Sequence, residues 1–208
     1  MTLTTAPAPQ RSVEGEPTWD IAKLFPMQGH WSESEYLRLN GNYFVEYTHG
    51  HIEVLPMPTQ MHQLIMVFLF DCLRAFIRPG KLGTALIAPL RVRIAPGKFR
   101  EPDVVFVLTE HDSWRQNDFW HGADLVMEVV SDDYRKHDLE TKRRDYALAG
   151  IPEYWIVDPM LREVTVLKLD GNRYEVHGVF RGAEAASSVL LPGFRVNVAE
   201  VFAAGDGK

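Results

Sequence analysis

Cysteine is almost absent from this 208-residue sequence, and long hydrophobic runs are absent from it altogether. The single cysteine, Cys72, excludes an internal disulfide, which fits a reducing compartment. The longest fully apolar run covers residues 64–70, far short of the roughly 20 residues that a membrane-spanning helix needs. We therefore expect a cytoplasmic protein without a membrane span.

Positive charge is also scarce, because 22 lysines and arginines stand against 28 aspartates and glutamates, for a net charge of −6. No global positive field attracts nucleic acid, so any contact with a polyanion must come from a local patch. The hydrophobic fraction of 46% and the charged fraction of 24% are ordinary for a globular chain in water.

Length and local composition predict one folded domain behind a disordered N-terminal tail. Residues 1–17 are rich in Thr, Ala and Pro and lack the apolar segment of a signal peptide. The remaining residues, 18–208, suffice for one substantial core and are too few for two comfortable domains.

The order of the predicted elements indicates an α/β fold. Two hairpins, at residues 43–55 and 163–179, are expected near the N-terminal and C-terminal sides of the core. Between them we predict one helix capped by Thr59, a second helix ending at Gly150, and strands at residues 84–94, 100–108, 125–130 and 154–158. This order predicts a mixed central sheet flanked by helices, with N-terminal and C-terminal hairpins.

Glu128 interrupts an apolar, β-branched run at residues 125–130, which is typical of a central strand covered on both faces. A carboxylate in such a strand is costly to bury unless a cation or hydrogen-bond donors compensate it. The helix that follows offers Lys142, which shares one helical face with Asp138 and Asp145. Glu128 is therefore either paired or functional.

Asp103, Glu128 and Lys142 are the residue types that a metal-dependent phosphodiesterase needs. Mg²⁺ prefers carboxylate and water oxygens, polarises a phosphoryl oxygen and acidifies a bound water. A lysine ammonium offsets the negative charge that develops in the transition state. We expect the two carboxylates within about 4–6 Å of each other if they share a cation. Spacing alone also permits a buried structural salt bridge between Glu128 and Lys142.

Longer sequence words around these residues resemble one nuclease family. The words are PDVV at residues 102–105, DLVMEVVS at 124–131, DLETK at 138–142 and YALAGIPEYWIVD at 146–158, with PTQMH at 58–62 and LPGF at 191–194. They resemble the Uma-type putative restriction endonuclease family of the PD-(D/E)XK nuclease superfamily, from about residue 36 to the C-terminus. The resemblance implies a restriction-endonuclease-like core.

By this resemblance Asp103 and Glu128 are ligands of Mg²⁺, with Mn²⁺ as the alternative metal, and the carbonyl of Val129 supplies a third oxygen. Val130 stands where the superfamily pattern Glu-X-Lys has its lysine. The resemblance therefore implies that the lysine has moved to the next helix, at Lys142. Asp103, Glu128 and Lys142 become the predicted catalytic residues.

Three more residues are predicted to support this site. Glu46 and His62 match a carboxylate and a histidine of the family, and Asp138 lies one helical turn before Lys142. His62 falls on the inward face of its predicted helix, where a histidine is more often a core residue than an active one.

Basic residues before Asp103 and around the second helix are predicted to form a rim that contacts phosphates, against the simpler interpretation of solvated side chains. The predicted rim residues are Arg91, Arg93, Arg135, Lys136 and Arg143.

The leading interpretation is a metal-dependent endonuclease that hydrolyses DNA phosphodiester bonds through a metal-activated water. One alternative is a non-catalytic nucleic-acid or protein interaction module on the same fold. Another is a metal-dependent phosphoesterase that acts on RNA or nucleotides. A duplex has two antiparallel strands, so we also expect a homodimer. Its expected interface is exposed apolar surface of segment 114–120 and of the hairpin around Tyr174.

Overall fold

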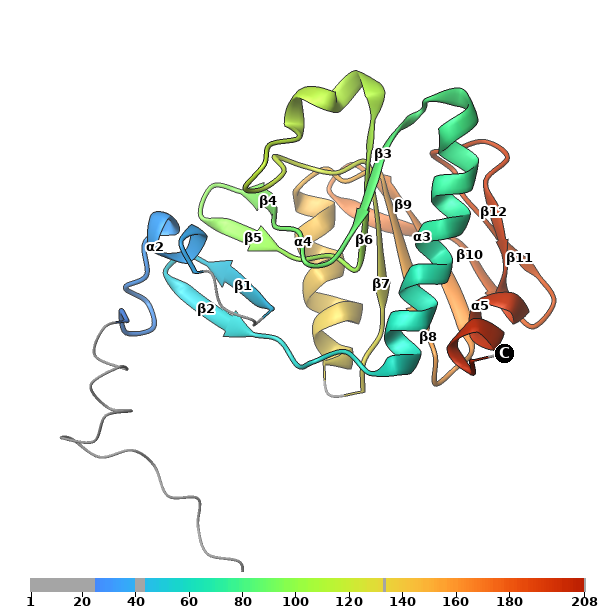
Figure 1. Ribbon diagram of the computed structural model, residues 1–208, viewed down its shortest axis with the longest axis horizontal. Helices are drawn as coiled ribbons and strands as arrows, with labels where there is room; N and C mark the ends of the chain where they lie inside the picture. Colours follow the sequence, from blue (N-terminus) through green and yellow to red (C-terminus); the bar gives the residue numbers. More distant parts are fainter. Residues whose placement is uncertain (1–24, 40–43, 133, 208) are drawn as a thin grey trace, which may run out of the picture.

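The centre of the molecule is a six-stranded mixed sheet (Figure 1). The structure is a computed structural model that describes residues 25–39, 44–132 and 134–207, so the predicted tail of residues 1–17 lies outside the described part. Within the order β10-β9-β8-β7-β6-β3, β7 and β8 run parallel and the other neighbours run antiparallel. The strands are β3 (Gly83–Ile87), β6 (Val104–Leu108), β7 (Leu125–Val129), β8 (Glu153–Asp158), β9 (Glu163–Asp170) and β10 (Arg173–Arg181).

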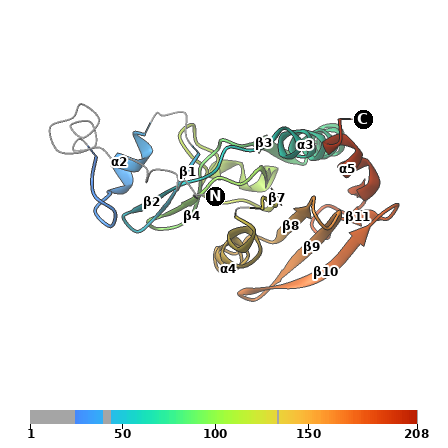
Figure 2. The ribbon, with the colours of Figure 1, turned by 90° about the horizontal axis from the view of Figure 1, so that it is seen from below.

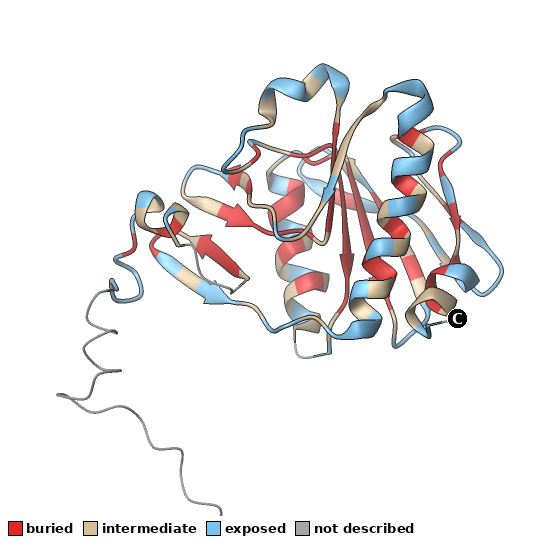
Figure 3. Cartoon of the chain, viewed as in Figure 1, coloured by how far each residue is buried: buried red, intermediate tan, exposed pale blue. Residues whose placement is uncertain are grey.

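The parallel strands β7 and β8 form the interior of this sheet. Every residue of both strands is buried, and Figure 3 shows this part of the sheet as the most buried of the molecule. Their apolar and β-branched composition explains the burial, since a strand covered on both faces has no solvent side to make polar. The predicted central strand around Glu128 is therefore confirmed.

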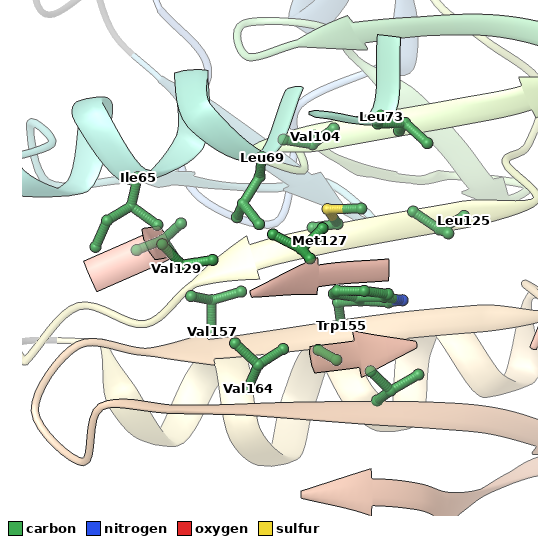
Figure 4. Packing of buried hydrophobic residues seen from close by; sticks show 14 of the residues in the cluster. Ile65, Leu69, Leu73, Val104, Leu125, Met127, Val129, Trp155, Val157 and Val164 are labelled. Carbon is green, nitrogen blue, oxygen red and sulfur yellow. The ribbon is translucent and has the colours of Figure 1, made fainter. Parts of the chain in front are cut away.

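One face of the sheet is covered by α3 (Gln60–Gly80) and α5 (Val198–Gly205) (Figure 2). Apolar side chains of α3 at a spacing of four residues, Ile65, Leu69 and Leu73, pack against the sheet around Met127 and Trp155 (Figure 4). This spacing places them on one helical face, which explains why α3 lies flat along the strands.

The start of α3 is fixed by Thr59, whose side chain accepts a hydrogen bond from the main-chain N–H of His62, as predicted for a helix cap. By length and composition alone, α3 could cross a membrane. A core helix meets the same criterion, and the inward side chains Ile65, Leu69 and Leu73 pack on the sheet.

The other face of the sheet is covered by a π-helical turn, His137–Lys142, that leads directly into α4 (Arg143–Leu148). A regular α-helix was predicted here, but residues 137–142 form a π-helical turn instead. A π-turn bonds residue i to residue i+5 and is frequent at functional sites. In this turn both Asp138 and Lys142 are buried against the body of the protein.

A second sheet of four strands, in the order β2-β1-β5-β4, extends from the central body (Figure 1). Its strands are β1 (Val45–Thr48), β2 (His51–Val54), β4 (Val92–Ala95) and β5 (Lys98–Arg100). The single strand predicted at residues 100–108 is therefore divided between two sheets. Pro102 lies at the division, where the absence of an N–H prevents it from extending either ladder.

Among the remaining elements, β11 and β12 pair antiparallel in a two-stranded sheet of their own. The α2 helix begins after Ser32, which forms a capping box with Glu35. The elements not yet given are α2 (Glu33–Leu37), the 3₁₀ helix Thr109–Trp114, β11 (Ala185–Ser187) and β12 (Arg195–Asn197).

Candidate active site

A cavity of about 380 Å³ opens where β6 begins and β7 ends. Figure 1 shows that α3 starts at this end of the central sheet. It is lined by the β2–α3 connection, the first turn of α3, the π-helical turn and the β8–β9 turn. Its acidic and basic side chains are His62, Glu101, Asp103, Glu128, Asp132, His137, Asp138 and Lys142. The three predicted catalytic residues and Val129 therefore line one cavity.

Asp103 and Glu128 occupy corresponding positions on neighbouring strands. In the antiparallel ladder of β6 and β7, Val104 lies opposite Met127, so Asp103 and Glu128 are the next opposite pair beyond it. Glu128 meets Lys142 and Tyr146 on the α4 side of the sheet, whereas Asp103, which directly precedes β6, meets His62 of α3. The prediction that the two strands are neighbours in the sheet is confirmed. The predicted distance of about 4–6 Å between the two carboxylates stays a prediction.

Both oxygens of the Glu128 carboxylate have donors in the protein. Lys142 Nζ lies 2.8 Å from Oε2, and the Tyr146 hydroxyl donates to Oε1 at 2.5 Å. Burial raises the pKa of Glu128, and the nearby charges of Asp103 and Asp138 raise it further, against the opposing effect of Lys142. Glu128 is thus held in place by two donors at a position where negative charge is costly.

Lys142 is the cation around which the buried carboxylates gather. Its Nζ atom lies 2.8 Å from Glu128, 3.2 Å from Asp138 and 3.8 Å from Glu46, and only 6% of its side chain is exposed. Burial acts to lower the pKa of Lys142, but these carboxylates outweigh it and raise that pKa well above its ordinary value. Lys142 therefore remains charged at the cavity wall.

Asp103 is oriented by two donors from different elements. Its Oδ1 atom lies 2.9 Å from His62 Nε2, and its Oδ2 atom accepts a 2.7 Å hydrogen bond from the main-chain N–H of Val129. Burial opposes protonation of the imidazole, but Asp103 raises the pKa of His62 above its ordinary value. His62 thus contacts a predicted metal ligand instead of serving as an apolar core residue.

Glu46 lies behind the cavity wall, in a set of interactions that reaches back to Lys142. Its carboxylate lies 3.0 Å from His137 Nε2 and 3.3 Å from Arg100 Nε. Burial opposes ionisation, but Lys142, His137 and Arg100 together lower the pKa of Glu46 to about 2. Glu46 therefore supports the site as an ionised carboxylate.

A second group of potential metal ligands adjoins this position. Glu46, Glu53 and His137 offer ligand atoms that all lie within 4.8 Å of one another. Glu46 and Glu53 are opposite residues on β1 and β2, so two like charges face each other there. This group was not predicted, and it does not include Asp103 or Glu128.

The donor chemistry of the cavity fits a hard divalent cation. Carboxylate oxygens of Asp103 and Glu128 and the main chain of Val129 lie at the same wall, and Mg²⁺ prefers such oxygens. Burial raises the pKa of Asp138, and it raises that of Glu101 to about 7. Within the described residues, the buried Oε2 atom of Glu101 has no hydrogen-bond partner. The cavity thus holds more buried carboxyl groups than the ammonium of Lys142 neutralises, and burial favours their protonated forms until a cation is bound.

The five basic residues predicted as a nucleic-acid rim are not brought together at this cavity. Arg91 donates to the carbonyls of residues 37 and 39, and Arg93 lies 3.3 Å from Glu33. The other two arginines are also engaged, Arg135 by Asp158 and Arg143 by the carbonyl of residue 174, while Lys136 is exposed. These arginines mainly connect elements of the protein, because carbonyl and carboxylate oxygens surround them.

The apolar residues that were predicted at a dimer interface are partly covered within the chain and partly exposed. Trp120 is 2% exposed and Tyr174 is 6% exposed, and Trp114 packs against the same core. In the Tyr174 hairpin, by contrast, Val176 is 52% exposed and Val179 is 39% exposed. The predicted apolar exposure therefore holds for these valines and not for Trp120 and Tyr174. The homodimer itself stays a prediction.

Sequence reasoning missed the roles of His137 and Tyr146, which contact Glu46 and Glu128. Tyr146 had been placed beside the packed face of its helix, and its position four residues after Lys142 was the available signal. His137 offered no comparable signal, since its partner Glu46 lies 91 positions away.

Comparison with known proteins identified a matching family and a similar solved structure. Residues 32–199 match the Uma2 family, whose description is "Putative restriction endonuclease". A crystal structure of a putative nuclease belonging to DUF820 from Anabaena variabilis is similar at a TM-score of 0.69 and 20% sequence identity, covering 86% of this chain and 99% of that chain. Among curated proteins there was no match. The structural likeness confirms the predicted restriction-endonuclease-like α/β core.

Proposed function

This chain belongs to the Uma2 family of putative restriction endonucleases, and we propose that it is a metal-dependent endonuclease that hydrolyses phosphodiester bonds of DNA. One observation carries the proposal. Asp103, directly before β6, and Glu128, on the neighbouring strand β7, line the same cavity, and Lys142 lies 2.8 Å from Glu128 there. This arrangement combines two carboxylates and one ammonium at a site that is open to a substrate.

The predicted metal ligands are the carboxylates of Asp103 and Glu128 and the carbonyl of Val129. A bound Mg²⁺ or Mn²⁺ would supply Lewis-acid polarisation of a phosphoryl oxygen and a lowered pKa for a coordinated water. The protein's own contribution is to fix the ligands in advance. The main-chain N–H of Val129 and the imidazole of His62 orient Asp103, while Tyr146 orients Glu128.

Lys142 is proposed as the residue that offsets negative charge on the phosphate during the reaction. Asp138 lies 3.2 Å from its ammonium and Glu46 lies 3.8 Å away, so Lys142 is held at the cavity wall by carboxylates on more than one side. An ammonium held in this way keeps its charge without needing to reorganise when a substrate arrives.

The first turn of α3 gives the phosphate a second attraction. Thr59, Met61 and His62 from this turn line the cavity, and the first turn contains no acidic residue. The N-terminus of a helix carries partial positive charge and unpaired N–H groups, which favour an anion. The helix therefore offsets part of the negative charge of the cavity.

The proposal is tested by incubating purified protein with plasmid DNA and with single-stranded DNA, in Mg²⁺, in Mn²⁺ or in EDTA. We expect cleavage in the presence of a divalent cation and none in EDTA. Glu128→Gln should abolish cleavage, whereas the matched control Glu175→Gln, at an exposed position of β10, should cut at the rate of the unmodified protein. Absence of cleavage under all metal conditions would support the non-catalytic interaction module instead.

A further inference from the structure

The opening of the cavity is apolar, although its floor is charged. Methionine and proline side chains from separate segments line it together with the acidic residues. Three of these methionines are strongly exposed: Met57 at 70%, Met61 at 44% and Met160 at 63%. They come from the β2–α3 connection, the first turn of α3 and the β8–β9 turn.

Scattered exposed apolar residues are ordinary, but three that converge on one cavity mark a binding surface. Methionine suits such a surface because its unbranched, polarizable thioether adapts to flat or irregular ligands. Pro56, Pro58 and Pro159 lie in the same lining and add apolar surface. The lining therefore offers contact to an apolar part of the substrate beside the charged floor.

Lysine and arginine side chains that could bind the phosphates of DNA are scarce at this opening. Among the described lining residues, Lys142 is the one lysine or arginine, and Glu128 and Asp138 already pair with it. Proteins that hold DNA by its backbone, duplex or single-stranded, place many lysines and arginines against its phosphates, so contact with a base must make up for their scarcity here. In a duplex, moreover, the apolar faces of the bases are stacked inside and cannot reach this lining.

We propose that the cavity accepts an unpaired base of single-stranded DNA, which packs on Met57, Met61 and Met160 while the adjacent phosphate lies at the Asp103–Glu128 floor. This assignment rests on the proposed nuclease function and specifies its substrate. An unpaired base presents a flat face that packs on apolar side chains regardless of sequence. The cavity of about 380 Å³ falls within the range of sites that enclose a small ligand group.

The test compares the binding of three fluorescent DNA oligonucleotides by anisotropy in buffer that contains Ca²⁺. They are a single strand, the same strand with abasic sites in its central positions, and the corresponding duplex. We expect the intact single strand to bind about tenfold more tightly than the other two. Stacking of one base on an aromatic side chain gives roughly a 5- to 150-fold gain, and packing on methionine should fall toward the lower end of that range.

A pair of variants assigns this gain to the cavity opening. The double substitution Met57→Ser and Met160→Ser should remove most of the single-strand preference. Leu148→Ser serves as the control, because Leu148 is 63% exposed on α4 and lies outside the cavity lining. All three substituted positions are exposed, so the melting temperatures of the variants should match that of the unmodified protein, which is measured alongside.

The outcomes separate this inference from the nuclease proposal. Equal affinity for intact, abasic and duplex DNA, or full single-strand affinity in the double variant, overturns the inference even if the protein cuts DNA. Methionine-dependent binding of the single strand supports the inference even if no DNA is cut, in which case the nuclease proposal alone fails.

Discussion

Lys142 and Glu128 form a buried ion pair of 2.8 Å across 14 positions of the chain, one residue from a π-helical turn and the other from a central strand. This contact is compatible with a structural salt bridge, because both residues are buried. It is equally compatible with a catalytic lysine, because both residues line the cavity. The interpretations differ in what a substitution at Lys142 changes, so experiments on this residue decide between them.

Replacing Lys142 should affect both stability and cleavage. In Lys142→Ala, Glu128 and Asp138 lose their cation while they remain buried, so we expect a loss of about 3–5 kcal/mol in the free energy of unfolding. Lys142→Arg keeps a positive charge and should lose less stability. If the ammonium acts on the phosphate, this variant should still lose about 10²–10³ in cleavage rate.

Melting curves and cleavage rates measured on the same preparations test this prediction. A Lys142→Arg protein that is stable and cuts DNA at the normal rate would show that only the charge at this position matters. A Lys142→Ala protein that retains both its melting temperature and its activity would contradict both proposed roles.

Divalent cations should stabilise the protein through Asp103 and Glu128. A cation at 100 times its dissociation constant adds about 2.7 kcal/mol, which raises the melting temperature of a chain of this size by about 5–10 °C. Asp103→Asn should abolish this increase. Glu53→Gln should keep it, because Glu53 belongs to the separate group with Glu46 and His137. Loss of the increase in Glu53→Gln, with retention in Asp103→Asn, would place the cation at that group instead.

Glu46 should make the protein sensitive to acid. Its pKa of about 2 in the folded protein lies below its ordinary value of 4.5, so its ionised form is favoured by folding. The resulting stabilisation, about 3 kcal/mol, is fully present above pH 4.5 and is lost as the pH falls toward 2. Denaturant titrations between pH 2 and pH 6 should show this loss, and Glu46→Gln should flatten the dependence. An equally steep dependence in the variant would contradict the assignment.

The Tyr146 hydroxyl should matter for cleavage as well as for stability. Tyr146→Phe removes one of the two donors to buried Glu128, and we expect a loss of about 1–3 kcal/mol in unfolding free energy. Tyr174→Phe is the matched control, since its buried hydroxyl donates at 2.7 Å to the carbonyl of Ile151, away from the cavity lining. Both variants should melt earlier, but only Tyr146→Phe should cut more slowly. Equal cleavage rates would remove Tyr146 from the site.

Local patterns were sufficient to predict much of the fold. The apolar run around Glu128, the Thr59 cap and the two hairpins each depend on residues close together in sequence, and the structure contains all of them. The division of residues 100–108 between two sheets was not predicted, because it depends on pairing with β1 and β7, which lie elsewhere in the chain.

The candidate site was predictable where chemistry singles out a residue. Glu128 stood out as a carboxylate in an apolar strand, and Asp103 as a carboxylate next to one. The arginines at positions 91 and 93 were placed in a nucleic-acid rim because their charge is visible in the sequence. The oxygens that bind these two arginines inside the protein could not be identified from the sequence. They are carbonyl and carboxylate oxygens of residues 33–39, which lie more than 50 positions away in the chain.

The hydrogen bond from the Val129 N–H to Asp103 ties the orientation of a predicted metal ligand to the pairing of β6 with β7. A chain still emerging from the ribosome, or one whose sheet has opened at this end, lacks the partner strand and therefore the site. Under the proposed function, the protein can cut DNA only after this sheet has formed. Misfolded copies would be unable to damage the genome of the cell that makes them.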